Sequence, residues 1–407
     1  MDEEKLIPSL RFSGYKDVWE RHKLEHYLNV SAEKNTEESF GKEDVLSVSG
    51  DFGIINQIKF HGRSFAGVST ANYGVVNTGD VVYTKSPLKA NPFGIIKTNK
   101  GPSGIVSTLY AVYHPNENVC PDFIQVYFEQ HARMNQYMHP LVNKGAKNDM
   151  KVSDANALKG HVIFPKVDEE ENIVEYFSNV DQLIALHQRE YNKLHILKKA
   201  MLEKMFPEKG MDAPEIRFNK FSEPWERRKL GECFKERNES APDGELLSVT
   251  INSGIKKTSD LDRQDNSNED KSKYKKVCIG DIAYNSMRMW QGASGYSPYE
   301  GIVSPAYTVL IPNEKVDSKC VSYLFKSTDM IRMFRINSQG LTSDTWNLKY
   351  PALSEIVIPL AKDIREQKKI AAYFSHLDNL IVLKQHKIEK LKNIKAGCLE
   401  KMFVSRR

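Results

Sequence analysis

The sequence contains two copies of one plan, and the second copy follows directly after the first. The segment PSLRFSGYKDVWERHKL begins at Pro8, and the similar segment PEIRFNKFSEPWERRKL begins at Pro214. The turns GDVVY and GDIAY then occur in the same order, and LEKMF closes both copies, at 202–206 and 399–403. Ordered matches of this kind indicate a tandem duplication. We therefore expect the chain to fold into two related halves.

The two copies agree in their frames and differ in their interiors. Between the same two landmarks, the first copy has KSPLKANPFGIIKTNKGPS at 85–103 and the second has NSMRMWQGASGYSPYE at 285–300. A scaffold that is used twice with different side chains indicates one function carried out on two different targets.

The interior of each copy is predicted to be mainly β structure, because short runs rich in Val, Ile and Tyr are bounded by Gly, Pro and Asn. Each copy also has one predicted helical stretch, Asp122–Val142 and Lys319–Asn337. The segments 173–206 and 370–403 lack Pro, and their apolar residues recur every three or four positions, which predicts two helices of roughly 50 Å. The predicted divisions are a first domain (1–172), a first helical segment (173–210), a second domain (211–369) and a second helical segment (370–407).

Leucines outside the heptad positions widen the apolar face of both long helices. Such a width is typical of a helix that packs against more than one neighbour. An intramolecular packing hairpin is the simplest interpretation, but the extra width also leaves apolar surface for other chains. The candidate positions for docking of partner subunits are Leu183, Leu186, Leu202, Met205, Leu380, Leu383, Leu399 and Met402.

The composition predicts a soluble cytoplasmic protein. The net charge of +5 arises from 58 basic and 53 acidic side chains, which argues against a tail-driven nucleic-acid binder but permits local basic patches. The five cysteines form no CxxC pair, so neither a zinc site nor a disulfide framework is expected. No run of about 18 apolar residues occurs, and we therefore expect no membrane span.

The sequence carries no motif that predicts catalysis. It contains no GxGxxG, no GxxxxGK[ST] and no HExxH. The tetrapeptide NPFG at Asn91 only partly matches an adenine-methyltransferase motif, and PDGEL at Pro242 only begins like a nuclease motif. Both are better interpreted as turns. We expect no catalytic residue, no metal site and no cofactor in this chain.

The divergent segments instead contain side chains suited to DNA. Arg, Lys, Asn and Gln hydrogen-bond to base edges, and Lys, Ser and Thr contact phosphates. In the first copy the candidates are Lys85, Lys89, Asn91, Lys97 and Lys100, with Lys144, Lys147 and Asn148 in a second loop. In the second copy they are Asn285, Arg288, Trp290 and Gln291, with Gln339, Thr342, Ser343 and Trp346 in the corresponding loop.

Taken together, these segments resemble the specificity (S) subunit of type I restriction-modification systems. The resemblance covers the chain from Pro8 to Phe403, and its most specific part is REQKKIAAYFSHLDNL, in which Glu366-Gln367 is followed by Ile370. At the corresponding positions the first copy reads Glu169-Glu170-Glu171-Asn172-Ile173, without the Gln.

The resemblance implies an α+β fold with two pseudo-symmetric, mainly β target-recognition domains, separated by two long antiparallel, coiled-coil-like helices. Each domain would read one half of a bipartite site in double-stranded DNA. Two methyltransferase (M) subunits would dock on the helices and supply adenine methylation with S-adenosylmethionine. Two restriction (R) subunits would add ATP- and Mg-dependent translocation and cleavage. The alternative left open by the residues is a duplicated scaffold that binds proteins and has no DNA specificity.

Overall fold

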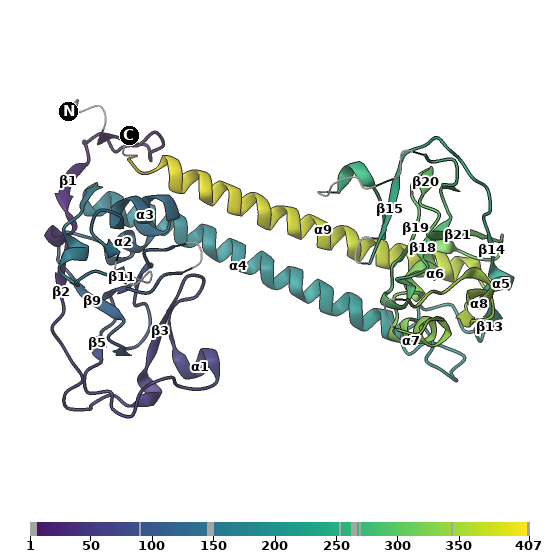
Figure 1. Ribbon diagram of the computed structural model, residues 1–407, viewed down its shortest axis with the longest axis horizontal. Coiled ribbons are helices and arrows are strands. Elements are labelled where there is room, and N and C mark those ends of the chain that lie inside the picture. Colours follow the sequence, from purple (N-terminus) through teal and green to yellow (C-terminus); the bar gives the residue numbers. More distant parts are fainter. Residues whose placement is uncertain are drawn as a thin grey trace. The chain divides into compact units, whose positions relative to one another are not determined.

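The computed structural model divides the chain into two compact units (Figure 1). Unit 1 comprises residues 1–187 with 387–407, and unit 2 comprises residues 188–386. Each unit therefore contains the β-rich part of one copy together with portions of both long helices. The structure describes residues 6–88, 91–144, 150–251, 254–261, 267, 270–342 and 345–404.

A four-stranded antiparallel sheet forms the centre of each unit, and its strand order is the same in both. The hydrophobic residues of the strands GDVVY and GDIAY lie in the middle of these sheets and are fully buried. In unit 1 the order is β2 (Leu28–Val30), β9 (Tyr110–Pro115), β6 (Val81–Thr84) and β7 (Ile96–Thr98). In unit 2 it is β14 (Phe234–Glu236), β21 (Tyr307–Pro312), β18 (Ile282–Asn285) and β19 (Ser294–Tyr296).

Three two-stranded antiparallel pairs also recur in both units. In unit 1 they are β1 (Glu20–Lys23) with β12 (His161–Phe164), β3 (Leu46–Ser49) with β4 (Gly53–Asn56), and β5 (Gly74–Val76) with β8 (Gly104–Val106). In unit 2 they are β13 (Glu226–Lys229) with β22 (Val357–Leu360), β15 (Leu247–Thr250) with β16 (Gly254–Lys257), and β17 (Lys275–Val277) with β20 (Gly301–Val303). Within the described residues, β10 (Asn143–Lys144) and β11 (Met150–Lys151) pair in unit 1 only.

The glycine that begins the GIVS strand is required by close packing in both units. A Cβ atom at Gly104 would lie 2.4 Å from the carbonyl oxygen of Asp44, and one at Gly301 would lie 2.3 Å from that of Glu245. Any side chain at either position would displace the neighbouring backbone. The repeated glycine is thus explained by the same backbone approach in each unit.

The helical stretch predicted in each copy is two helices rather than one. In unit 1 these are α2 (Pro121–Phe128) and α3 (His131–Met138), and in unit 2 α6 (Ser318–Leu324) and α7 (Thr328–Asn337). Gln130 and Ser327 interrupt the stretches because their backbones are extended, and the Ser327 side chain caps α7 by accepting from the Met330 amide. Three shorter helices complete the described part: α1 (Gln57–His61), α5 (Leu230–Cys233) and α8 (Tyr350–Ser354).

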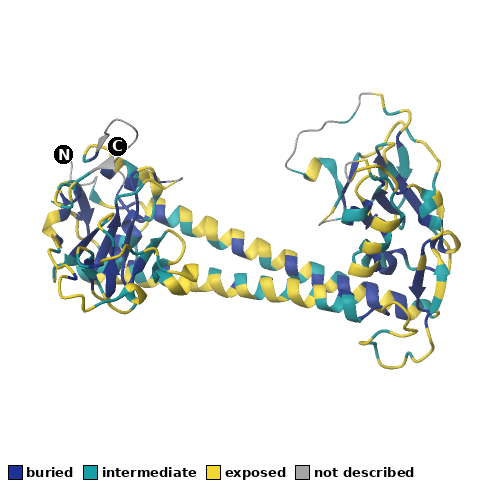
Figure 2. Ribbon diagram, turned by 60° about the horizontal axis from the view of Figure 1, so that its bottom comes forward, coloured by how far each residue is buried: buried dark blue, intermediate teal, exposed yellow. Residues whose placement is uncertain are grey.

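The two long helices are confirmed as α4 (Val167–Lys204) and α9 (Ile364–Lys401). Both begin six residues earlier than the sequence predicted, with acidic residues in the first turn that suit a helix N-terminus. In unit 2 their portions run antiparallel, since Glu190 pairs with Lys384 while Lys198 pairs with Asp378. Buried and exposed residues alternate along both helices (Figure 2). None of the helices in the described part of the chain is long and apolar enough to cross a membrane.

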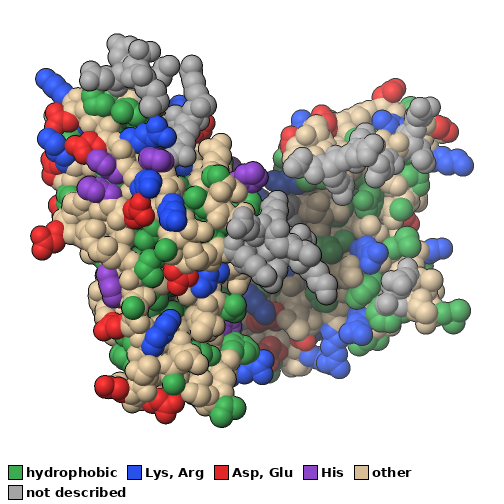
Figure 3. All heavy atoms as spheres, turned by 60° about the vertical axis from the view of Figure 1, so that its left-hand side comes forward, with side chains coloured by type: hydrophobic (Ala, Val, Ile, Leu, Met, Phe, Trp, Pro, Cys, Tyr) green, Lys and Arg blue, Asp and Glu red, His purple; other side chains and the backbone are tan. Residues whose placement is uncertain are grey.

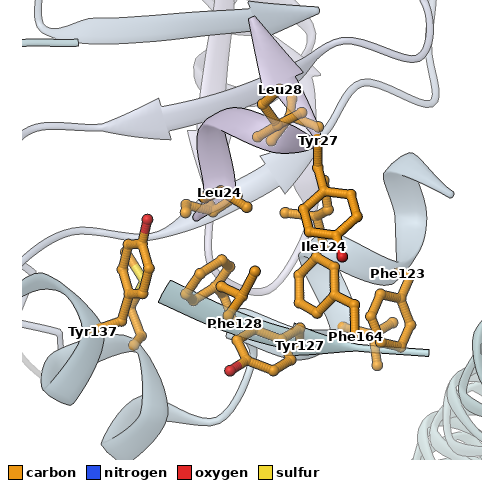
Figure 4. Packing of buried hydrophobic residues seen from close by; sticks show 14 of the residues in the cluster. Leu24, Tyr27, Leu28, Phe123, Ile124, Tyr127, Phe128, Tyr137 and Phe164 are labelled. Carbon is orange, nitrogen blue, oxygen red and sulfur yellow. The ribbon is translucent and has the colours of Figure 1, made fainter. Parts of the chain in front are cut away.

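The repeated LEKMF segment lies in the hydrophobic core of each unit. In unit 1, Phe403, just after the end of α9, lies with its ring centroid 6.2 Å from that of Trp19 and 5.7 Å from that of Phe123. The surrounding aromatic side chains of α2, α3 and β12 converge on the same core (Figure 4). In unit 2, Phe206 at the end of α4 lies 6.1 Å from both Trp225 and Phe374. The repetition therefore reflects two equivalent packing environments.

Candidate nucleic-acid interface

The two divergent loops of unit 2 meet at a pair of tryptophans. Trp290 belongs to a single 3-10 turn (Met289–Gln291), and Trp346 lies in the loop before α8. Their ring centroids are 5.2 Å apart and the rings are nearly perpendicular. The Leu348 amide also donates to the Ser286 carbonyl at 2.9 Å, which fixes one loop against the other. Two segments that the sequence presented separately thus form one continuous surface.

Arginine side chains lie beside this tryptophan pair. The guanidinium carbon of Arg335, on α7, is 5.4 Å from the centroid of the Trp346 ring, a distance suited to a cation–π contact. Arg288 is exposed on the other loop, one residue before the turn that carries Trp290. Sequence reasoning missed Arg335 because it lies in a helix rather than in a divergent loop. Arg335 is exposed, but so are Asp329 and Arg332 on the same helix, and no sequence signal distinguishes it from them.

The remaining candidates of unit 2 lie in or beside the same two loops. The Asn285 carboxamide oxygen accepts from the Met287 amide at 3.0 Å, and the Trp290 indole N–H donates to the Met287 carbonyl at 3.1 Å. Both contacts fix the turn from within. The other described candidates are partly or fully exposed: Gln291, Gln339 and Thr342. Ser343 lies outside the described residues.

This surface combines aromatic rings, guanidinium groups and carboxamides. Aromatic and guanidinium planes can stack on bases, while amides and guanidinium groups hydrogen-bond to base edges and phosphates. An apolar side chain is also exposed here, since Met287, in the loop that carries Trp290, has 45% of its full accessibility. The surface is thus chemically suited to a nucleic acid.

The candidates of unit 1 are largely engaged within the unit. The ammonium group of Lys85 lies 3.0 Å from the carboxylate of Asp154. Lys100 is paired in the same way with Asp122, also at 3.0 Å. Such partly exposed ion pairs contribute little free energy, so either lysine can leave its carboxylate partner and bind a phosphate with little loss of stability.

Two further candidates of unit 1 are buried. Asn91 is 6% exposed, and its side-chain oxygen lies 2.7 Å from His131 Nδ1. Lys97, on β7, is also 6% exposed, and burial lowers the pKa of its ammonium group. Neither side chain reaches the surface in this conformation. Lys144 belongs to β10, and Lys89, Lys147 and Asn148 lie outside the described residues.

Charges of both signs are mixed on the surface of unit 1. Figure 3 shows the face of this unit that comes forward in that view, with Lys and Arg side chains interspersed among Asp and Glu. The net charge of the whole chain is only +5, and such a mixture of charges is suited to local phosphate contacts rather than to a broad basic surface.

The candidate docking residues fall into two groups. Leu183, Leu186 and Leu383 are 45%, 50% and 62% exposed, and Leu380 is partly exposed. The other four, at the helix ends, are 8% exposed or less: Leu202, Met205, Leu399 and Met402. Only the first group presents apolar surface to another chain. The second group is occupied in the cores of the two units.

Residues 222–393 match the protein family described as "Type I restriction modification DNA specificity domain". The matched segment contains the tryptophan pair, β13 to β22 and most of α9. Among curated proteins, none matches the chain significantly.

Solved structures resemble the chain over nearly its whole length at low sequence identity. A type I restriction-modification S subunit from M. genitalium is 12% identical, with a TM-score of 0.58, covering 98% of this chain and 100% of that one. A structure described for complex assembly and conformational transition of the type I R-M system is 16% identical, with a TM-score of 0.50, covering 95% and 97%. An HsdS subunit from Thermoanaerobacter tengcongensis is 16% identical, with a TM-score of 0.47, covering 97% and 99%. The first two likenesses show the fold.

Proposed function

We propose that the chain, whose residues 222–393 match the type I restriction modification DNA specificity domain, is a DNA specificity subunit over its whole length. In this proposal each unit reads one half of a bipartite site in double-stranded DNA. The chain itself catalyses nothing. Methylation and cleavage depend on partner subunits that carry S-adenosylmethionine, ATP and Mg.

The observation that carries the proposal is the tryptophan surface of unit 2. Trp290 and Trp346 come from two loops that differ from their counterparts in unit 1, while the sheets beneath them have the same strand order in both units. A shared frame with different contact residues is what two different half-sites require. Stacking and guanidinium contacts supply the affinity, and the carboxamides supply base selectivity.

We further propose that the exposed leucines of α4 and α9 receive methyltransferase subunits. Leu183, Leu186 and Leu383 project from helices whose heptad positions are buried or partly buried, so the exposed surface of these leucines is available to another chain. Two methyltransferase subunits, one for each copy, follow from the duplication, and two restriction subunits would join the same assembly. A non-apolar substitution at Leu383 therefore tests docking without opening a core.

The decisive experiment exchanges residues 25–165 for the corresponding segment of a related specificity subunit. Adenine methylation is then mapped across the genome of cells that express the chain with its methyltransferase subunit. We expect only one half of the methylated motif to change, because only one unit has been exchanged. A change in both halves, or in neither, would contradict the proposal. The reciprocal exchange within residues 231–356 is the matched control and should change only the other half.

Trp290→Ala is expected to weaken specific DNA binding by about tenfold or more, since stacking of one base on an aromatic ring contributes about 1–3 kcal/mol. The fold should persist, because the indole is half-buried and its N–H donates, within the described residues, only to the Met287 carbonyl of the same turn. Fluorescence anisotropy of a labelled duplex bound by the complex measures the effect. Trp225→Phe, a change in the core of the same unit, is the control and should leave DNA affinity unchanged in the folded fraction.

A scaffold that binds proteins is the second candidate, and an aromatic cluster in unit 1 favours it. Phe52, Phe60 and Phe65 are 64%, 45% and 55% exposed, and Phe52 and Phe60 lie 5.2 Å apart. Aromatic side chains are enriched at protein interfaces. If the complex with the methyltransferase protected no DNA from cleavage in a footprinting assay, this candidate would replace the first.

A further inference from the structure

A single lysine connects three separate segments beneath the tryptophan surface. Lys326 lies between α6 and α7, and its ammonium group donates to three main-chain carbonyls. The acceptors are Gly292 at 2.5 Å, Ser294 at 2.8 Å and Ile251 at 3.1 Å. An ammonium group has three N–H donors, so all of them are used.

The carbonyls that Lys326 binds control the position of the turn that carries Trp290. Gly292 ends this turn in the left-handed conformation, with φ of 84°, and Ser294 begins β19 directly after it. Ile251 follows β15, on the neighbouring hairpin. Hydrogen bonds to a charged donor are stronger than those between neutral groups. Lys326 therefore fixes the base of this turn against both β19 and the β15–β16 hairpin.

The ammonium group lies in an environment that disfavours its charge. Burial, together with the neighbouring Lys198, lowers the pKa of Lys326 to about 8, and Asp378 opposes this shift. Lys198 and Asp378 themselves form the ion pair between α4 and α9, which Tyr323 of α6 supports by donating to Asp378 at 2.8 Å. Burial of a charged lysine costs free energy unless its N–H groups are hydrogen-bonded, and the three carbonyls accept those hydrogen bonds.

Unit 1 has a different residue at the equivalent position. Phe128-Glu129 corresponds to Phe325-Lys326, and the Glu129 carboxylate lies 3.0 Å from the ammonium group of Lys395. Lys395 also pairs with Asp181 at 2.7 Å, as Lys198 pairs with Asp378 in unit 2. The carboxylate of Glu129 has no N–H to donate to a carbonyl. At this position unit 2 thus has a lysine that binds carbonyls of the loop, and unit 1 has a glutamate that binds the lysine of the long helix.

We propose that Lys326 is a positioning residue for sequence recognition by unit 2, holding the turn that carries Trp290 in its reading conformation. This inference rests on the proposed function. Lys326 does not itself contact DNA; it acts through the carbonyls of Gly292 and Ser294. Without it, the turn samples other conformations, and discrimination between bases of the second half-site falls.

The test compares four full-length variants, each in complex with the methyltransferase subunit. Lys326→Met removes the donors and keeps much of the side-chain volume. Lys326→Arg keeps the charge and the donors. Lys326→Glu reproduces the arrangement of unit 1, in which the Glu129 carboxylate pairs with Lys395 of the long helix. This variant loses the hydrogen bonds to the loop but can pair with Lys198, so it separates positioning of the loop from packing of the helices. Lys319→Met is the control, because Lys319 lies in the neighbouring helix α6 and its ammonium group lies over the Tyr296 ring of β19 rather than at the carbonyls of Gly292 and Ser294.

Two measurements are made on each variant: amide hydrogen exchange of residues 286–295 without DNA, and the methylated motif in cells. For Lys326→Met and Lys326→Glu we expect faster exchange in this segment and a loss of discrimination of about tenfold in the second half-site alone, as for one lost base contact. Lys326→Arg should largely restore both, and Lys319→Met should alter neither.

The outcomes separate the inference from the proposed function. If the unaltered chain directs methylation to no bipartite motif, the proposed function fails, whatever the exchange data show. If the motif is bipartite and Lys326→Met and Lys326→Glu leave both exchange and the second half-site unchanged, the positioning role is wrong. Loss of both half-sites together, with faster exchange in α4 and α9, would show that Lys326 only maintains the fold.

Discussion

Replacing Arg217 with alanine is expected to lower the free energy of unfolding of unit 2 by about 3–5 kcal/mol, the usual cost of leaving a buried charge without its partner. The Arg217 guanidinium donates to both oxygens of Glu366, at 2.7 and 2.8 Å. Glu366 is 1% exposed and lies in the first turn of α9. Without Arg217, its carboxylate must stay ionised in an apolar setting or take up a proton.

Chemical denaturation, monitored by hydrogen exchange in residues 364–378, measures this loss within unit 2. The double variant R217M/E366L is the control, because replacing both partners with apolar groups should recover most of the stability. Arg11 makes the same bidentate contact with Glu169 in unit 1, at 2.7 Å for both bonds, so Arg11→Ala should destabilise that unit instead. A cost below about 1 kcal/mol for Arg217→Ala would place this pair among weak surface pairs.

Replacing Glu170 with glutamine is expected to stabilise unit 1 by a few kcal/mol at pH 9, because each pKa unit corresponds to about 1.4 kcal/mol. Glu170 is fully buried in the first turn of α4. One carboxyl oxygen accepts from the Cys120 amide at 2.7 Å, and the other is buried without a hydrogen-bond partner in the described part of the chain. Burial raises the pKa of Glu170 to about 8.

Unit 2 has a glutamine in this position, and its contacts explain what Glu170 lacks. The Gln367 oxygen accepts from the Asp317 amide at 2.8 Å, as Glu170 does from Cys120. The Gln367 amide group donates to the carbonyls of Ala361 at 2.8 Å and Lys315 at 3.1 Å. An ionised carboxylate cannot donate, so only a protonated Glu170 can imitate this part of the glutamine.

The sign of the pH dependence follows from the raised pKa. Between an ordinary glutamate pKa near 4.5 and the value of about 8 in unit 1, the folded state retains a proton that the unfolded state has lost. The stability that Glu170 contributes is therefore complete below about pH 4.5 and is lost as the pH rises through about 8. We expect the free energy of unfolding of unit 1 to fall over this window, and Glu170→Gln to abolish that fall.

Denaturation of the full chain at a series of pH values, with hydrogen exchange resolving the two units, checks this expectation. The matched control is Gln367→Glu, which should introduce the same pH dependence into unit 2. If Glu170→Gln left the pH profile of unit 1 unchanged, Glu170 would be ionised in the folded state and compensated by another group.

The sequence predicted the features that periodicity and repetition encode. The long helices were found because their apolar residues recur over more than thirty positions, and the two units were found from the ordered matches of the two copies. It also predicted Trp290 and Trp346 as separate candidates. It could not predict that they meet, because the contact depends on how two loops distant in sequence close over one sheet.

The residues that prediction misjudged or missed depend on tertiary surroundings. Lys97 has the chemistry of a phosphate contact, but it faces the interior from β7, and no local signal distinguishes it from the exposed Lys100. Lys326 lies in a short linker between two helices and is revealed only by the three carbonyls around it. The helical break at Ser327 was likewise missed, since a single capping serine interrupts an otherwise helical pattern.

Unit 1 is formed by segments from both ends of the chain, and this affects how it folds during synthesis on the ribosome. Unit 2 is one continuous stretch, residues 188–386, and can fold while the remainder is still being translated. Unit 1 lacks part of its core until Leu399, Met402 and Phe403 have emerged, because these side chains close the cluster around Trp19. The half that is translated first is thus completed last. A chain that ends before residue 399 lacks these three side chains and leaves the apolar cluster around Trp19 incomplete.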